Sequence, residues 1–368
     1  MRTLSMLWIL GIAAGVAFPQ ESRSVVLAAT RAGRVEILDA QSLHILASLA
    51  VNGQTESVSA SPDGRTLYVA QESEATPGGC CGLFSLDLAS RQMCFLIAPA
   101  LFGAPSRDGR YLFTQQGNDG VEVFDARLLA RLPSIKAPGA YSLHPSPDGR
   151  WLLGLTNTPA PSVDVFDVGR GELARRIPLP SGPAMGAWAG DRFDVYSHDE
   201  SGGKLWRVNP ESTALPPAKS VHLPDLHGDC THSLLLTMAG SPNRLFIAEA
   251  FGFKLDRRRA CAQEARGGIY VIDAFNGGVE DYISEAVYVN RMAVARDGHE
   301  LYVMDSSGPD EDGIRLLRID SNTGRVLASR ESQPGVWNLA LANIPTALIP
   351  HGRARTSIRA AGGGSCQR

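Results

Sequence analysis

The chain has 368 residues, of which 44% are hydrophobic and 20% are charged, and its formal net charge is −3. This composition is typical of a globular protein and excludes fibrous, collagenous and coiled-coil proteins. The near-neutral charge argues against a nucleic-acid-binding protein, because phosphate recognition needs a concentrated basic face.

The N-terminal segment has the pattern of a secretory signal. Arg2 supplies a positive charge, and residues 4–18 form an uncharged, largely apolar run that contains the small residues Gly15 and Ala17. The run is shorter than the roughly 20 apolar residues of a membrane-spanning helix. We therefore expect residues 1–20 to be a signal peptide and the mature protein to be periplasmic or secreted. An uncleaved membrane anchor is the alternative.

An internal repeat runs through the rest of the chain. A turn signal related to Ser-Pro-Asp-Gly-Arg is followed each time by an apolar run, and it recurs at 61–65, 106–110, 146–150, 189–192, 241–244 and 295–299. Asp-Gly between apolar runs is typical of a tight hairpin, because Gly adopts positive φ without a steric penalty.

A second signal repeats in step with the first. Alternating strands that end in Asp or Asn recur seven times, with their last residues at Asp39, Asp87, Asp125, Asp167, Asn209, Asp273 and Asp320. Alternation with a period of two indicates half-buried strands. Repeats of about 40–50 residues with four strands are typical of propeller blades. The sequence therefore predicts an all-β, seven-bladed β-propeller over residues 25–346, with two stacked β-sandwiches as the alternative.

The two ends of the predicted ring are complementary. The first repeat begins at Val25 with its second strand and lacks an inner strand, whereas residues 337–343 supply an extra strand after the last repeat. We expect this C-terminal strand to complete the first blade and so to pair an otherwise open edge. The tail, residues 350–368, is basic and Gly-rich, and we expect it to be disordered.

One face of the predicted ring carries the long connections, which commonly carry function on a rigid scaffold. One of them contains His227, Asp229 and His232, and a neighbouring loop contains His198. Imidazole and carboxylate groups are metal ligands, so these four residues are candidate ligands. A polar surface loop without a metal is the alternative.

The six cysteines lie in a chain that we expect to be exported, where disulfides form. Cys230 and Cys261 fall on same-face loops of adjoining blades and are a candidate disulfide. Cys80 and Cys81 allow a vicinal disulfide or a pairing with Cys94, and free or separately paired thiols are the alternative.

The loop over residues 250–268 combines aromatic and cationic side chains, namely Phe251, Phe253, Arg257 and Arg258. Arg and aromatic residues are enriched at protein interfaces, so these four are candidate partner contacts. A solvated loop is the alternative. The sequence contains no nucleophile elbow, phosphate loop or HExxH motif, and we assign no catalytic residue.

Two levels of resemblance follow from the repeat. The segments SPDGRTLYVA and IYVIDAFNGG resemble the bacterial YVTN/WD40-like propellers. The segments 121–139, 146–168 and 244–278 resemble blades of the heavy chain of quinoprotein amine dehydrogenases, of the methylamine and aralkylamine type. In that family the heavy chain is a non-catalytic scaffold that holds a small light chain. The light chain carries a tryptophan-derived quinone, oxidises a primary amine and passes electrons to a periplasmic copper protein.

The resemblance thus implies a scaffold subunit with no cofactor of its own. A YVTN-type binding propeller without catalysis is the alternative. A third hypothesis is a lactonase-like hydrolase, because gluconolactonase-type propellers place Glu and Asn metal ligands at the starts of inner strands, where this chain has Glu56 and Asn290. The other equivalent positions, Leu101, Tyr141, Ala184 and Trp337, are poor ligands.

Overall fold

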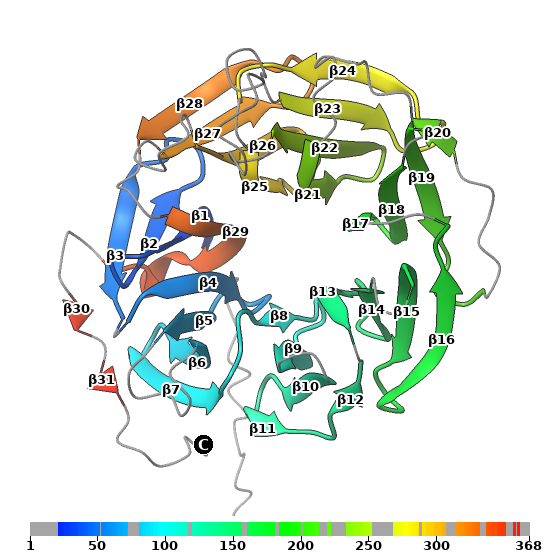
Figure 1. Cartoon of the computed structure of the whole chain (residues 1–368). Coiled ribbons are helices and arrows are strands. Elements are labelled where there is room, and N and C mark those ends of the chain that lie inside the picture. Colours follow the sequence, from blue (N-terminus) through cyan, green and yellow to red (C-terminus); the bar gives the residue numbers. More distant parts are fainter. Residues whose placement is uncertain are drawn as a thin grey trace, which may run out of the picture.

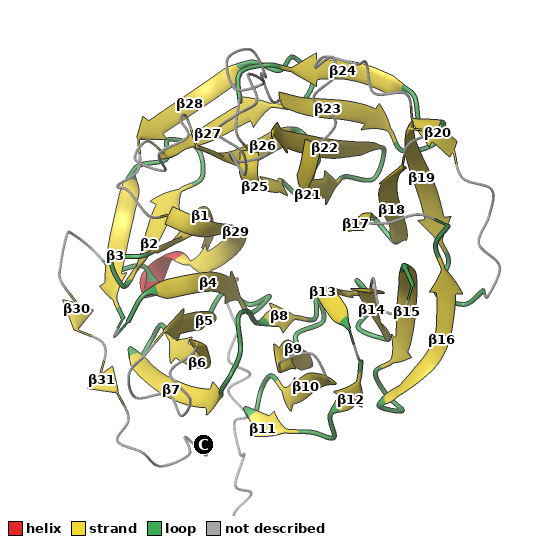
Figure 2. Ribbon diagram, viewed as in Figure 1, coloured by secondary structure: helices red, strands yellow, loops and turns green. Residues whose placement is uncertain are grey.

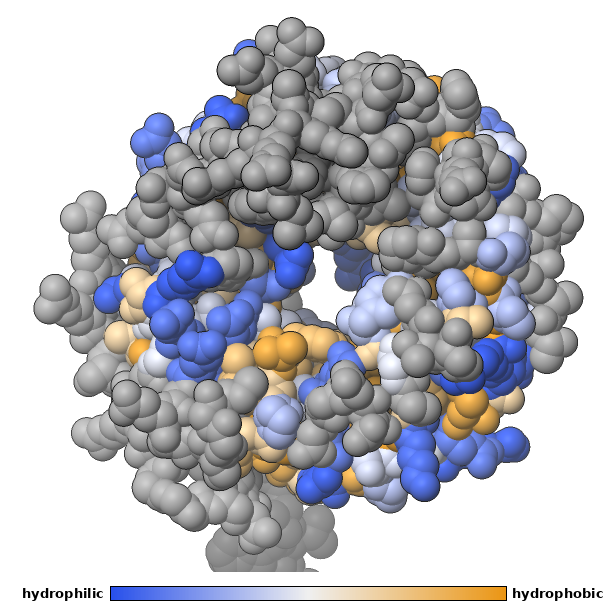
Figure 3. Space-filling model, viewed as in Figure 1, coloured by the Kyte–Doolittle hydropathy of each residue, from blue (hydrophilic) through white to orange (hydrophobic). Residues whose placement is uncertain are grey.

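The computed structural model describes residues 21–51, 53–72, 81–116, 120–137, 139–156, 160–180, 184–199, 202–212, 219–221, 233–251, 268–286, 289–306, 314–331, 336–350, 356–357 and 359–360. The strands in these ranges form seven sheets, which are arranged like blades around a central opening (Figures 1 and 2). The space-filling view shows that side chains leave this central channel open (Figure 3). The predicted seven-bladed propeller is confirmed.

The blades are numbered along the chain, and their strands are given from the channel outwards. Blade 1 contains β29 (Val336–Pro345), β1 (Ser22–Thr30), β2 (Arg34–Asp39) and β3 (Ile45–Ala50). Blade 2 contains β4 (Thr55–Ala60), β5 (Thr66–Glu72), β6 (Cys81–Asp87) and β7 (Gln92–Ile97). Blade 3 contains β8 (Ala104–Pro105), β9 (Tyr111–Gln116), β10 (Gly120–Asp125) and, beside β10, the short β11 (Ala130–Arg131) and β12 (Ile135–Lys136).

Blade 4 contains β13 (Ala140–Pro145), β14 (Trp151–Thr156), β15 (Ser162–Asp167) and β16 (Glu172–Pro178). Blade 5 contains β17 (Ala184–Ala189), β18 (Arg192–Asp199), β19 (Gly202–Val208) and β20 (Lys219–Val221). Blade 6 contains β21 (Ser233–Gly240), β22 (Arg244–Phe251), β23 (Gly268–Asp273) and β24 (Val279–Ile283). Blade 7 contains β25 (Val289–Val294), β26 (Glu300–Ser306), β27 (Ile314–Asp320) and β28 (Val326–Glu331), and a short 3₁₀ turn, η2 (Thr346–Leu348), follows β29.

The repeated Ser-x-Asp-Gly signal forms the turn between the first and second strands of a blade. In blade 3 the Ser106 hydroxyl donates to Asp108 Oδ1 at 2.6 Å, and Gly109 N–H donates to the Ser106 carbonyl at 3.0 Å. Gly109 has φ +72°, a conformation that glycine adopts readily. The same Ser-to-Asp bond forms in blade 2 at 2.6 Å and in blade 4 at 2.5 Å. Local side-chain hydrogen bonds therefore fix the turns that the sequence predicts.

The apolar core lies between neighbouring blades. Leu153 and Val165 of blade 4, for example, pack in one cluster with Phe193 and Val195 of blade 5, and all four are fully buried. Side chains on alternate positions of a strand point to opposite faces of its sheet, so each blade packs against a neighbour on both sides. The alternating sequence pattern is therefore satisfied on both faces by the ring.

The C-terminal strand closes the ring, as the sequence predicts. Strand β29 pairs antiparallel with β1 from Ser22 opposite Pro345 to Thr30 opposite Val336. The first strand begins at Ser22 and the closing strand ends at Pro345, so both extend beyond the residues 25 and 343 expected from the repeat. Blade 1 is thus built from both ends of the chain.

Part of the C-terminal tail lies along the outside of the ring. Two short strands, β30 (Thr356–Ser357) and β31 (Arg359–Ala360), pair in parallel with β3 of blade 1 and β7 of blade 2 (Figure 1). The sequence predicts disorder over 350–368, whereas these four residues take part in sheets. The remainder of 351–368 lies outside the described residues.

The predicted signal peptide, residues 1–20, also lies outside the described residues. Within the part of the chain that the structure describes, no helix has the length and apolar character to cross a membrane.

Candidate functional site

The two faces of the ring differ in which connections they carry. The Asp-Gly turns and the turns between third and fourth strands lie on one face, the turn face. The second strand of each blade ends, and the third begins, on the opposite face, the loop face, where the blades are also joined to one another. The strands that flank the segments 73–80, 252–267 and 307–313 end on the loop face. The described strands on either side of these connections therefore meet them on the loop face, which is the face where the sequence predicts the long connections.

Five inner strands among the described residues carry a one-residue bulge at their loop-face end. The pairing register skips one residue in each of β4, β13, β21, β25 and β29, and the skipped residues are Glu56, Tyr141, Leu236, Asn290 and Trp337. A bulge inserts one extra residue into a strand and bends the strand there. Because they lie at the loop-face ends of the inner strands, these five residues surround the mouth of the channel. The repeat had aligned four of them, and Leu236 was missed.

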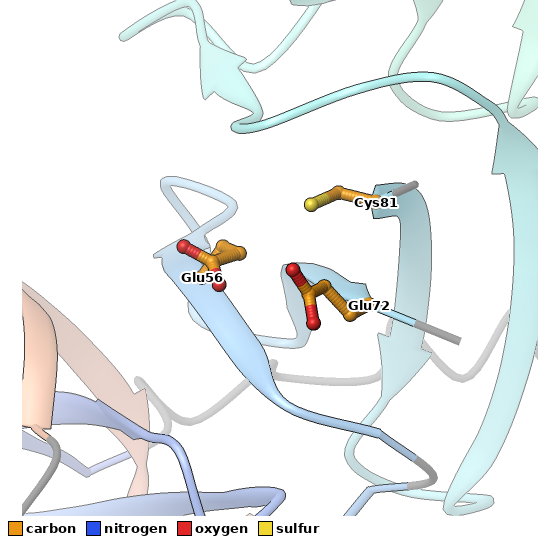
Figure 4. A group of neighbouring side chains, drawn as sticks. All are labelled: Glu56, Glu72 and Cys81. Carbon is orange, nitrogen blue, oxygen red and sulfur yellow. The ribbon is translucent and has the colours of Figure 1, made fainter. Parts of the chain in front are cut away.

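Three side chains of blade 2 converge beside this mouth (Figure 4). Glu56 is the bulged residue of β4, Glu72 is the last residue of β5 and Cys81 is the first residue of β6. Glu72 and Cys81 are direct cross-strand partners. One carboxylate oxygen of each Glu and the Cys81 sulfur all lie within 4.8 Å of one another.

The three side chains of this group differ in their exposure to solvent. Cys81 is 3% exposed and its thiol is not in a disulfide, so Cys81 is paired neither with Cys80 nor with Cys94, whereas Cys94 is itself disulfide-bonded. Glu56 is half-buried and Glu72 is exposed. The group therefore opens to the channel mouth on its carboxylate side and is closed on its sulfur side.

No cation compensates the two carboxylates within the described part of the chain, where neither the Glu56 nor the Glu72 side chain makes a hydrogen bond or an ion pair. Other acidic groups of the ring have arginine partners. Asp164, which is 1% exposed, receives two bonds of 2.7 Å from Arg176. Among the described residues, blade 2 therefore holds two neighbouring carboxylates without an ion-pair partner.

Backbone hydrogen bonds fix the strands that carry the group. Glu72 N–H donates to the Gln54 carbonyl at 2.8 Å, which ties the end of β5 to the start of β4. Ala100 N–H donates to the Cys81 carbonyl at 2.8 Å, and the Ser57 hydroxyl donates to the Leu101 carbonyl at 2.9 Å. The connection from blade 2 to blade 3 is thereby held against the group.

Exposed apolar side chains lie on the connection that follows blade 2 and on the inner strand of blade 4. Leu101 is 57% exposed in the connection that leads to blade 3, and Tyr141, the bulged residue of blade 4, is 42% exposed. Figure 3 shows apolar surface along the rim of the channel over β8, between β4 and β13. We call Leu101 and Tyr141 the apolar rim.

A half-buried imidazole lies on the inner strand of blade 4. His144 Nε2 contacts the Ser142 hydroxyl, and its ring packs on Phe193 of blade 5 with centroids 5.1 Å apart. Burial lowers the pKa of His144 to about 4. The imidazole is therefore neutral near pH 7, and its packing between blades indicates a structural role.

The structure describes little of the sequence-predicted candidates. His198 is the penultimate residue of β18, opposite Gly203, and it occupies in blade 5 the register position that Glu72 occupies in blade 2. Phe251 is the last residue of β22. The remaining candidates lie outside the described residues, namely His227, Asp229, Cys230, His232, Phe253, Arg257, Cys261 and Arg258.

Sequence reasoning missed Glu72 and considered Cys81 only as a disulfide candidate, although the two residues flank one connection, residues 73–80. It did single out Glu56, for a different arrangement with Asn290. The structure places Asn290 on blade 7, and blade 1 stands between it and blade 2.

The fold and the site together define a seven-bladed β-propeller with a thiol and two carboxylates at its channel mouth. No protein-family model matches the chain, and no match among curated proteins was found. The similarities to known proteins that follow are therefore similarities to solved structures.

Similar solved structures belong to propellers of different functions. Hydrazine synthase of Kuenenia stuttgartiensis has 16% identity and a TM-score of 0.62, over 80% of this chain and 96% of that chain. A putative 6-phosphogluconolactonase of Bacteroides fragilis has 14% identity and a TM-score of 0.59, over 88% and 99%. Dihydro-haem d1 dehydrogenase NirN has 16% identity and a TM-score of 0.53, over 88% and 76%. These likenesses show the fold alone, and none of the three is an amine dehydrogenase heavy chain.

Proposed function

We propose that the chain is an exported, non-catalytic scaffold propeller that binds a partner protein on its loop face. The observation that carries this proposal is the apolar rim. Leu101 and Tyr141 are large apolar side chains, 57% and 42% exposed, on adjoining blades at the centre of the face that carries the long connections.

The position of the apolar rim suits an interface. Aromatic anchors such as Tyr at the centre of a contact surface supply much of the binding energy, and the residues around them exclude water. The turn face is a poorer surface for this purpose, because its Ser and Asp side chains are engaged in their own turns, as Ser61 is with Asp63 and Ser106 with Asp108.

The specific form of the proposal is the heavy subunit of a periplasmic amine dehydrogenase. The resemblance of segments 121–139, 146–168 and 244–278 to that family supports it. The partner is then a small light chain with a tryptophan-derived quinone, and a copper protein accepts the electrons. This chain positions the light chain and supplies part of the substrate path, and it takes no part in the bond-breaking steps.

The test is purification of the protein from its native host with bound partners. We expect a small second chain and a visible absorbance band that primary amines bleach. A partner without a chromophore would leave a YVTN-type binding propeller without catalysis. A colourless monomer would contradict both forms of the proposal.

A matched pair of variants locates the interface. Leu101→Asp introduces a charge into the apolar rim, and we expect it to release the partner. Leu128→Asp changes a leucine that is 59% exposed in the turn after β10, on the turn face, and we expect it to retain the partner. Equal retention by both variants would move the interface away from the apolar rim.

A lactonase-like hydrolase is a second candidate, favoured by one observation. Glu56 and Asn290 are both bulged residues at the channel mouth, which is where gluconolactonase-type propellers hold their metal. This function requires lactone hydrolysis that depends on a divalent ion and is abolished in both Glu56→Ala and Asn290→Ala. Activity that survives Asn290→Ala would exclude it.

A further inference from the structure

We propose that Glu56, Glu72 and Cys81 form a zinc-binding site with one open coordination position at the channel mouth (Figure 4). The site goes beyond the proposed scaffold function and does not depend on it. It also differs from a channel site built on Glu56 and Asn290, because its three ligands come from three adjacent strands of one blade.

The spacing of the three side chains suits a tetrahedral ion. Bonds of about 2.0–2.3 Å place tetrahedral ligand atoms about 3.3–3.8 Å apart. The two carboxylate oxygens and the Cys81 sulfur already lie within 4.8 Å of one another. The exposed Glu72 side chain can rotate to shorten these distances, and the buried Cys81 side chain provides the fixed reference point.

Charge supplies an independent argument. Glu56 and Glu72 lie beside a thiol and, within the described residues, have no arginine or lysine partner. Elsewhere in the ring the fully buried Asp305 pairs with Arg315 at 2.6 Å, and Asp164 pairs with Arg176. Like charges at this separation repel, and a divalent cation is the group that would neutralise both carboxylates at once.

The residue types select the metal. A thiolate is a soft ligand that favours zinc, whereas calcium and magnesium take oxygen ligands only. Binding replaces the Cys81 S–H bond with a zinc–sulfur bond, and the proton leaves to solvent. Three protein ligands leave the fourth position to water, on the exposed carboxylate side, which is the arrangement of zinc sites that accept an exchangeable ligand.

The first test measures affinity in the full-length protein. The chain is stripped with a chelator and titrated with Zn²⁺ against a chromophoric competitor, and we expect one equivalent to bind. Outer-shell residues at metal sites are worth about 10–100-fold in affinity. We therefore expect losses of more than about 100-fold in Glu56→Gln and in Glu72→Gln. Glu285→Gln, at an exposed carboxyl outside the site, is the matched control.

The second test identifies the sulfur ligand. Co²⁺ in place of Zn²⁺ gives a near-ultraviolet thiolate-to-metal band, which we expect in the native protein and in Glu285→Gln and not in Cys81→Ser. Circular dichroism of the stripped variants separates loss of the site from loss of the fold. A zinc equivalent that survives the double change of Glu56 and Glu72 to Gln, or a cobalt complex without the thiolate band, would overturn the proposal.

Discussion

The contact between the first Asp-Gly turn and the closing strand can be tested with a single methyl group. Gly64 lies in the turn of blade 2 with φ +66°, and a Cβ placed there would lie 1.9 Å from the Asn343 carbonyl oxygen and 2.9 Å from Ile344 Cα. Both contacts are to the backbone of β29, so neither can be relieved by rotating a side chain. Gly171 provides the control, because it has φ +68° and a Cβ there would meet nothing within 4 Å.

The difference between the two variants isolates the contact. In both, alanine in the left-handed region costs about 1–2 kcal/mol, and the lower entropy of the unfolded chain offsets about 0.4–1 kcal/mol of that. Gly171→Ala should therefore lower the free energy of unfolding by about 1 kcal/mol. Gly64→Ala adds an overpacking term of about 1–3 kcal/mol, for a total loss of about 2–4 kcal/mol.

Urea unfolding followed by tryptophan fluorescence measures both losses. The variants are compared by the urea concentration at the midpoint of unfolding, with the same dependence of the unfolding free energy on urea (the m-value) in each. A larger loss in Gly64→Ala places β29 against the turn of blade 2. Equal losses in the two variants would refute the reasoning, because they would mean that the closing strand does not approach Gly64.

Two further predictions concern polar groups that pack within and between the blades. Removal of Arg176 by Arg176→Met strands the carboxylate of Asp164, which is 1% exposed, and should lower the free energy of unfolding by about 3–5 kcal/mol. Asp164→Asn should cost less, because the Arg176 side chain is 38% exposed and can turn to water; the reverse order in chemical unfolding would contradict this account. Because burial lowers the pKa of His144 from 6.5 to about 4, the unfolded chain binds more protons between these values, and stability should fall as pH is lowered from 6.5 to 4. The melting temperature of His144→Gln should lose less over this range, and an unchanged pH profile would exclude His144 as the cause.

The architecture could be predicted from the sequence because it rests on local patterns. The Asp-Gly turns and the strands that end in Asp39 or Asp167 are held by hydrogen bonds within a few residues, such as Ser42 N–H to Asp39 at 2.8 Å. A turn that is stabilised by hydrogen bonds within a few residues can be recognised from a short stretch of sequence. Ring closure was also predictable, because an incomplete first repeat and a surplus last strand can be counted.

The site could be predicted only in part. Glu56 was visible as an inner-strand residue, but its direction depends on the bulge between Thr55 and Ser57, which no residue pattern marks. Its neighbours Glu72 and Cys81 come together through the pairing of β5 with β6. Proximity across strands is set by register, and register emerges only when the whole blade is assembled.

Blade 1 can be completed only after the closing strand β29 has been synthesised, because the blade is built from both ends of the chain. Strand β1 is made at the start of synthesis, and the residues that pair with its inner edge, Val336–Pro345, are made more than 300 residues later. Until then the inner edge of β1 stays open, although its residues Val25–Ala29 are fully buried in the finished ring. Open strand edges template aggregation, and contacts this distant in sequence form slowly. A chain that ends before residue 336 keeps this aggregation-prone strand edge open. The closing strand therefore also distinguishes full-length molecules from fragments.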